Sequence, residues 1–128
     1  MKYLLDTLLL VWTANQPGRL SKTAVELIDD PGNDLYFSSI SIWEVAIKQG
    51  LQRGGLSVDA KVLRRGLMEA GYRELALTSD HGIAILNLPP IHQDPFDRIL
   101  IAQAISEGIT LLTSDNLIAR YPGPIRKV

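Results

Sequence analysis

Residues 94–115 read DPFDRILIAQAISEGITLLTSD, and this stretch predicts one helix followed by one buried strand. An Asp at position 94 with Pro95 directly after it is typical of a helix N-terminus. Apolar residues then recur with helical spacing until Gly108, where we expect the helix to end. Residues 109–112 (ITLL) form a short, mostly apolar run without polar alternation, typical of a strand whose two faces are both covered by helices.

The same alternation of strand and helix extends over the rest of the chain. Strands are expected at residues 3–5, 35–37, 74–78 and 109–112, with a C-terminal edge segment around Ile125. Helices are expected over residues 8–12, after Ser21, over residues 42–49, from residue 59 onwards, and over residues 79–86, 94–107 and 116–120. A loop is expected at Gly54 and Gly55. This pattern predicts a three-layer α/β/α fold with a mainly parallel central sheet, formed by one domain over residues 1–128.

The composition narrows the class of protein further. The chain has 128 residues, 46% of them apolar, which excludes a disordered protein. Thirteen Lys and Arg oppose fourteen Asp and Glu, which excludes a polybasic arm that binds nucleic acid by bulk charge. The absence of cysteine excludes disulfide scaffolds and zinc-thiolate sites. Asp6 interrupts the apolar N-terminal run, so we expect no signal peptide, no membrane span and a cytoplasmic protein.

Two aspartates follow predicted strands at the edge of the sheet where ligands usually bind. Asp6 comes after residues 3–5, and Asp115 comes after residues 109–112. Asp97 lies in the first turn of the helix that begins near Asp94. Each of these three aspartates has a structural alternative as a helix N-cap or a helix-dipole partner, worth about 1 kcal/mol.

Glu44 has no such alternative at a helix start. Its neighbours in sequence are almost all apolar, and its one basic neighbour at helical spacing is Lys48. A surface ion pair with Lys48 would contribute only about 0.3–0.5 kcal/mol. Because this helix is too apolar to be mostly exposed, we expect the Glu44 carboxylate to face a polar cavity or a cation.

The four carboxylates suit a divalent cation if the fold gathers them. Like charges at close range would otherwise force at least one carboxyl to stay protonated. Oxygen ligands without cysteine favour Mg²⁺ or Mn²⁺ over zinc, and such an ion supports chemistry on phosphodiesters. The hydroxyls of Thr7, Thr113 and Ser114 are expected to orient water or a carboxylate, or to satisfy nearby backbone groups.

Two further side chains are candidates for contact with a substrate. His92 lies in the loop that leads to Asp97, although a structural or surface role is the commoner one for such a histidine. Arg98 directly follows Asp97, where it is expected to contact phosphate or to pair with Asp94.

These motifs together resemble a PIN domain, and more closely the toxin ribonucleases of VapBC-type toxin–antitoxin pairs. The resemblance spans nearly the whole chain in order and spacing, although many members carry a His where this chain has Leu8. The residues that carry it are Asp6-Thr7, Trp43-Glu44, the segment from Asp94 to Ala104, and Thr113-Ser114-Asp115.

The resemblance implies a Mg²⁺- or Mn²⁺-dependent endoribonuclease that a cognate antitoxin inhibits, usually as a homodimer. Asp6 and Asp97 would be the main metal ligands, Asp115 would complete the coordination directly or through water, and Glu44 would orient or activate the attacking water. Two alternatives remain open at this point. One is a silent PIN-like module that binds RNA or protein; the other is a phosphatase or phosphoacceptor, which usually needs an Asp-x-Asp motif absent at Asp6.

Overall fold

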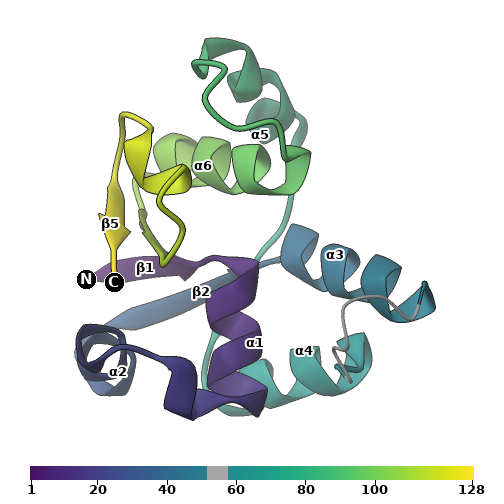
Figure 1. The fold of residues 1–128 in the computed structure, drawn as a ribbon, viewed down its shortest axis with the longest axis vertical. Helices are drawn as coiled ribbons and strands as arrows, with labels where there is room; N and C mark the ends of the chain where they lie inside the picture. Colours follow the sequence, from purple (N-terminus) through teal and green to yellow (C-terminus); the bar gives the residue numbers. More distant parts are fainter. Residues whose placement is uncertain (52–57) are drawn as a thin grey trace.

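The computed structural model describes residues 1–51 and 58–128 and contains a sheet of five parallel strands (Figure 1). Their order across the sheet is β3-β2-β1-β4-β5. The strands are β1 (Lys2–Leu5), β2 (Asp34–Ser38), β3 (Arg73–Leu75), β4 (Thr110–Thr113) and β5 (Ile125–Lys127). The predicted α/β class with a mainly parallel sheet is therefore confirmed, and every described strand pair is parallel.

Helices cover both faces of this sheet and complete three layers. Helices α1, α2 and α4 lie on one face, α5 and α6 lie on the other, and α3 leaves the end of β2 (Figure 1). The bounds are α1 (Thr7–Asn15), α2 (Lys22–Asp29), α3 (Ser39–Gly50), α4 (Ala60–Glu69), α5 (Ser79–Ala84) and α6 (Pro95–Glu107). Short 3₁₀ turns are η1 (Pro17–Arg19), η2 (Ile85–Asn87) and η3 (Ile118–Arg120).

The central strands are apolar on both sides because each side packs against helices. In β1, Tyr3 and Leu5 belong to the core beneath α1 and α4, whereas Leu4 belongs to the core beneath α6. In β4, Leu112 belongs to the core beneath α1 and α4, and Leu111 belongs to the core beneath α6. Alternate side chains of a strand point to opposite faces, so a sheet with two covered faces produces the continuous apolar runs seen in the sequence.

The order of the strands sets the position of the site. From β1 the chain adds β2 and then β3 on one side, and it later adds β4 and β5 on the other side. The sheet therefore changes its direction of growth between β1 and β4, where Leu5 is in register with Leu112. In parallel α/β sheets, the carboxyl ends of the strands at such a switch point leave a crevice that binds ligands.

The local predictions are largely confirmed, with differences at element ends. Helix α6 begins after Asp94, whose carboxylate accepts a hydrogen bond from the Phe96 N–H, and ends at Gly108 in the left-handed conformation (φ 66°). Helix α3 begins three residues before the predicted start, because the Ser38 hydroxyl caps it at the Ile40 N–H. The predicted strand 74–78 is shorter (β3), and the predicted helix 116–120 is the 3₁₀ turn η3. The predicted loop at Gly54 and Gly55 lies outside the described residues.

Within the described residues, no helix has both the length and the apolar character needed to cross a bilayer.

Gly123, in the turn before β5, generates a prediction about stability. Its φ is 135°, and an added Cβ would lie 3.1 Å from Cγ1 of Ile105. We expect Gly123→Ala to lower the free energy of unfolding by roughly 1–3 kcal/mol in urea denaturation, mainly because alanine avoids this backbone conformation. Gly18→Ala is the matched control, since a Cβ there meets nothing within 4 Å, and it should change stability by less than about 0.5 kcal/mol. Equal effects of the two substitutions would contradict this account of the turn.

Candidate active site

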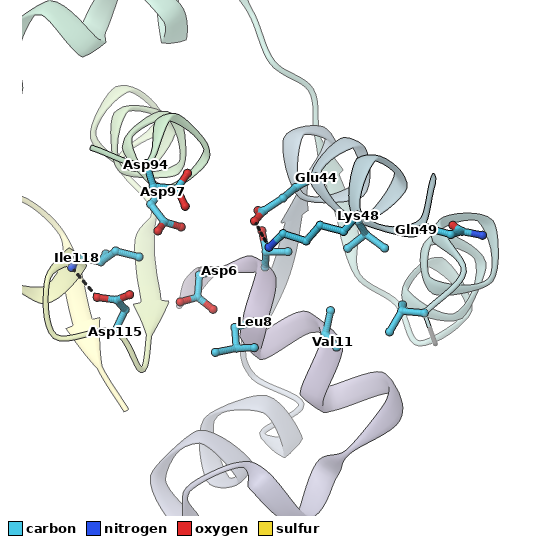
Figure 2. Close-up of a pocket in the computed structure, with 13 residues that line it drawn as sticks. Asp6, Leu8, Val11, Glu44, Lys48, Gln49, Asp94, Asp97, Asp115 and Ile118 are labelled. Carbon is cyan, nitrogen blue, oxygen red and sulfur yellow. Dashed lines mark hydrogen bonds and ion pairs between the residues drawn. The ribbon is translucent and has the colours of Figure 1, made fainter. Parts of the chain in front are cut away.

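A pocket of about 210 Å³ opens at the carboxyl ends of β1 and β4, between α1, α3 and α6 (Figure 2). Side chains that are far apart in the sequence converge on it. The four acidic residues selected from the sequence all line this pocket: Asp6, Glu44, Asp97 and Asp115. A fifth carboxylate, that of Asp94, lines it as well.

Asp6 is fixed at the joint between β1 and α1. One carboxylate oxygen accepts a hydrogen bond from the Leu9 N–H (2.9 Å) and so caps α1, while the other accepts one from the Thr113 hydroxyl (2.6 Å). Asp6 is therefore both an N-cap and a pocket residue, and the two interpretations of the sequence do not compete. Burial raises its pKa from 3.8 to about 6, although the Thr113 and Leu9 hydrogen bonds oppose the rise, and the charges of Asp115 and Glu44 add to it.

Asp97 reaches the pocket from the first turn of α6. Burial, together with the charges of Asp94, Glu44 and Asp6, raises its pKa from 3.8 to about 7. His92 lowers the pKa of Asp97, because its Nε2 lies 2.9 Å from Oδ2 of Asp97. The environment of Asp97 therefore disfavours the charged form that a metal ligand requires, unless positive charge is supplied nearby.

Glu44 enters from α3, on the opposite side of the pocket from α6 (Figure 2). One of its carboxylate oxygens, Oε2, lies 2.9 Å from the Lys48 ammonium. The other oxygen, Oε1, is buried and has no hydrogen-bond partner among the described residues. A buried carboxylate oxygen without a partner among these residues is costly, so its chemistry fits a position beside a cation or a water molecule.

Asp115 and the nearby hydroxyls complete the frame of the site. The Asp115 carboxylate accepts hydrogen bonds from the N–H groups of Leu117 (2.7 Å) and Ile118 (3.3 Å), which fix the turn after β4. Thr113 holds both Asp6 and the Asp115 backbone N–H. Thr7 lines the pocket, but its hydroxyl donates to the Ser41 hydroxyl (2.8 Å) and so joins α1 to α3. Ser114 is not among the described residues that line the pocket.

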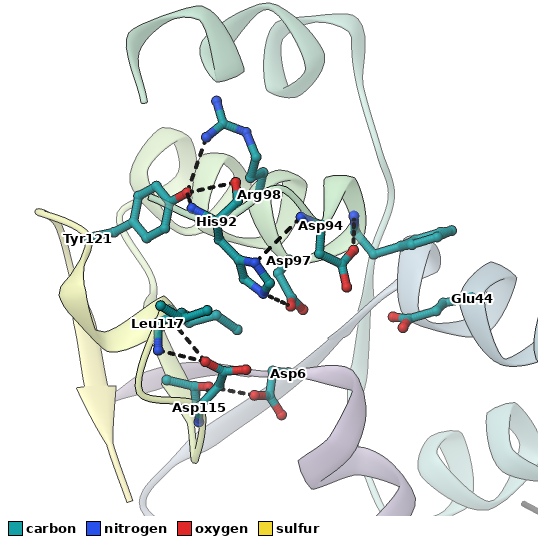
Figure 3. Close-up of polar contacts among 12 residues, drawn as sticks. Asp6, Glu44, His92, Asp94, Asp97, Arg98, Asp115, Leu117 and Tyr121 are labelled. Carbon is teal, nitrogen blue, oxygen red and sulfur yellow. Dashed lines mark hydrogen bonds and ion pairs between the residues drawn. The ribbon is translucent and has the colours of Figure 1, made fainter. Parts of the chain in front are cut away.

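The two predicted substrate contacts are both engaged with the protein itself (Figure 3). The Arg98 guanidinium points away from the carboxylates and donates to the Pro89 carbonyl (2.9 Å) and the Tyr121 hydroxyl (3.1 Å). The prediction that Arg98 pairs with Asp94 is therefore wrong, because Arg98 instead ties the loop before α6 to Tyr121. His92 does lie at the site, where its ring holds Asp97 and its backbone N–H donates to the Tyr121 hydroxyl (2.7 Å).

Three polar residues that line the pocket were not predicted to do so. Asp94 was interpreted only as a helix cap, although it precedes Asp97 by three residues, a spacing that places both on one face of the first turn. Lys48, expected from the sequence to pair with Glu44 at the surface, lines the pocket together with Gln49. The i,i+4 spacing from Glu44 was the available signal for Lys48.

The residues present fit a hard divalent cation. Five carboxylates face one pocket, from the joint of β1 and α1, from α3, from the start of α6 and from the turn after β4. At the start of α6, ligand atoms of Asp94, Asp97 and the nearby His92 lie within 4.8 Å of one another. Oxygen-rich, partly hydrated sites of this kind suit Mg²⁺ or Mn²⁺. Positive charge there would lower the raised pKa values of Asp6 and Asp97 towards ordinary carboxylate values.

The raised pKa values predict how stability depends on pH in metal-free buffer with chelator. Between the unfolded value of 3.8 and the folded values of about 6 and 7, the folded chain binds more protons at Asp6 and Asp97 than the unfolded chain does. The free energy of unfolding should therefore fall as the pH rises through this interval. Asp97→Asn should make that fall shallower in urea denaturation, whereas Asp80→Asn, an exposed site on α5, should leave it unchanged. A wild-type slope in Asp97→Asn would contradict the burial argument.

Comparison with known proteins places this fold and pocket in a family. The PIN domain model matches residues 3–124. Ribonuclease VapC22 of Mycobacterium tuberculosis is 30% identical over 125 residues, which are 95% of each chain.

Solved structures show the same fold at lower identity. A chain in the complex of VapBC2 from Rickettsia felis with a promoter DNA fragment is similar with a TM-score of 0.72 and 18% identity, and the match covers 99% of this chain and 98% of that one. A chain in the DNA-bound VapBC of Salmonella typhimurium gives a TM-score of 0.64, also at 18% identity and with the same coverage. Because the family model spans most of the sequence and the curated relative matches nearly end to end, the chain belongs to the PIN domain family, as a VapC-like member.

Proposed function

We propose that this protein is a Mg²⁺- or Mn²⁺-dependent endoribonuclease and the toxin of a toxin–antitoxin pair. The observation that carries the proposal is the convergence of Asp6, Glu44, Asp97 and Asp115 on one pocket, with a buried Glu44 oxygen that has no partner among the described residues. The similarity to ribonuclease VapC22 supports RNA as the substrate.

In this proposal Asp6, Asp97 and Asp115 hold the divalent ion. When bound, such an ion polarises water and offsets the negative charge that builds on the phosphate oxygens during hydrolysis. Thr113 keeps one Asp6 oxygen oriented, and His92 does the same for Asp97 through its Nε2 contact. Holding the ligands in place before substrate binds reduces the reorganisation that the reaction requires.

Glu44 is proposed to act on water rather than on the ion alone. Its free Oε1 accepts a proton from the attacking water as the water oxygen bonds to phosphorus. The bond between phosphorus and the leaving ribose oxygen breaks, and that oxygen gains a proton from solvent. The Thr7–Ser41 hydrogen bond links α1 to α3, and so fixes Glu44 relative to Asp6.

The partners are proposals of the same kind. We infer an antitoxin partner because the relatives of known structure are solved as VapBC complexes, and because Trp43 (58% exposed) and Leu51 (57% exposed) present apolar surface along α3 beside the pocket. We also propose that the protein forms a homodimer. We propose a cytoplasmic location as well, since the RNA substrate is found in the cytoplasm. Light scattering on the purified chain tests the dimer.

Two conservative substitutions test the assignment of the catalytic carboxylates. Asp6→Asn and Asp97→Asn each remove one negative charge but keep the side-chain shape, so the fold should persist by circular dichroism. We expect each to lower kcat for cleavage of a single-stranded oligoribonucleotide by about 100-fold or more. Asp80→Asn is the control for loss of a carboxylate outside the pocket. Cleavage at the wild-type rate in both pocket variants would disprove the assignment.

A separate measurement tests the metal without depending on activity. A ligand that binds only the folded state raises stability by about 2.7 kcal/mol at a concentration one hundred times its Kd. We therefore expect Mn²⁺ to raise the Tm of the wild-type protein near pH 8, and chelator to reverse the increase. Asp97→Asn should lose most of this response. An unchanged Tm in the wild type at millimolar Mn²⁺ would mean that the pocket does not bind the ion.

A further inference from the structure

Lys48 is the one basic residue among the described residues that line the acidic pocket. It projects from α3 towards Glu44, and its Nζ lies 2.9 Å from Glu44 Oε2 (Figure 2). The Lys48 side chain is 51% exposed, whereas the Glu44 side chain is 8% exposed. The Lys48 side chain is therefore open to solvent although it pairs with a buried carboxylate.

The bond to Glu44 does not commit Lys48 to a purely structural role. A helical i,i+4 ion pair with a half-exposed lysine is weak, so the flexible Lys48 side chain can leave it at little cost. An ammonium group also has three N–H donors, and the structure gives Lys48 one partner, the Glu44 carboxylate. Its remaining donors are available to an anion that enters the pocket.

The charge of the pocket creates a need for such a donor. Five carboxylates face the cavity, against the single ammonium of Lys48. A bound divalent ion would still leave the described lining negative, yet the proposed substrate is a polyanion. Contacts from Lys or Arg to phosphate oxygens are the usual means of holding a nucleic-acid backbone.

Arg98, the arginine of the described residues that was expected to contact phosphate, is not available for this purpose. Arg98 points away from the pocket and is bonded to the Pro89 carbonyl and to the Tyr121 hydroxyl. On the basis of the proposed function, we infer that Lys48 donates a hydrogen bond to a non-bridging oxygen of the phosphodiester that is cleaved. In the free protein the Lys48 ammonium donates a hydrogen bond to Glu44, and when RNA binds it donates to the substrate phosphate instead.

This contact predicts a specific kinetic pattern for Lys48→Met. We expect KM for a single-stranded oligoribonucleotide to rise about 10-fold, because a charge-assisted hydrogen bond to substrate is lost. The slope of log KM against log salt should decrease by about 0.7, the value for one phosphate contact on a single strand. Lys48→Arg should recover most of the affinity. Lys22→Met, which removes an exposed lysine at the start of α2, should change neither quantity.

A role limited to orienting Glu44 would give a different result. In that case Lys48→Met would lower kcat but leave KM and its salt slope unchanged, and the inference would be overturned. No change in any of these quantities would overturn it as well.

A binding experiment separates this inference from the proposed nuclease activity. Fluorescence anisotropy of a labelled oligoribonucleotide is measured with Asp97→Asn and with the double variant Asp97→Asn, Lys48→Met. Weaker binding by the double variant supports the phosphate contact even if the wild type proves to cleave no RNA. Equal binding by the two, alongside normal wild-type cleavage, would reject the contact and leave the nuclease intact.

Discussion

The loss of solvent around carboxylates that share one small pocket, reinforced by their mutual repulsion, is the constraint on which the rest of this structure depends. Asp6 is 4% exposed, and its charge is opposed both by burial and by the neighbouring acids Asp115 and Glu44. Asp97 experiences the same opposition from three other carboxylates. An arrangement that raises carboxyl pKa values to about 6 and 7 weakens the fold at neutral pH, so it needs a compensating function.

The topology of the fold brings these carboxylates into one pocket. Asp6 and Asp115 follow adjacent parallel strands on the two sides of the switch point, where two connections leave in opposite directions and open a crevice. Glu44 and Asp97 then enter from α3 and α6, which follow β2 and precede β4. Thr113, which donates a hydrogen bond to Asp6, is buried, and so is Ser41, which accepts one from Thr7 and joins α3 to α1. The position of the site is therefore a consequence of strand order. Its chemistry depends on which positive group neutralises the carboxylates.

The sequence was sufficient to predict the class of fold and the residues that meet. Helix α6 and strand β4 could be predicted because capping, periodicity and an apolar run agree over residues 94–113. Glu44 stood out because no helix-end explanation was available for a carboxylate among apolar neighbours. The confirmed fold places all four selected acids at one pocket, whereas their roles in catalysis and metal binding remain proposals.

The remaining features depend on side-chain directions that spacing does not determine. Arg98 follows Asp97 directly, so adjacency in sequence suggested a shared site, but consecutive helical residues point about 100° apart. Arg98 consequently faces Tyr121, which is distant in sequence and was not linked to it. Lys48 was underestimated for the opposite reason. An i,i+4 pair is usually a surface feature, and the structure shows that Lys48 lines the pocket together with its buried Glu44 partner.

The most direct test of the account is an anomalous difference map from crystals of the protein grown with Mn²⁺. The account predicts a peak within coordination distance of carboxylate oxygens from Asp6 and Asp97, with Asp115 bound directly or through water. A map with no peak between these side chains, although Mn²⁺ is present at saturating concentration, would contradict the claim that a divalent cation balances the gathered negative charge.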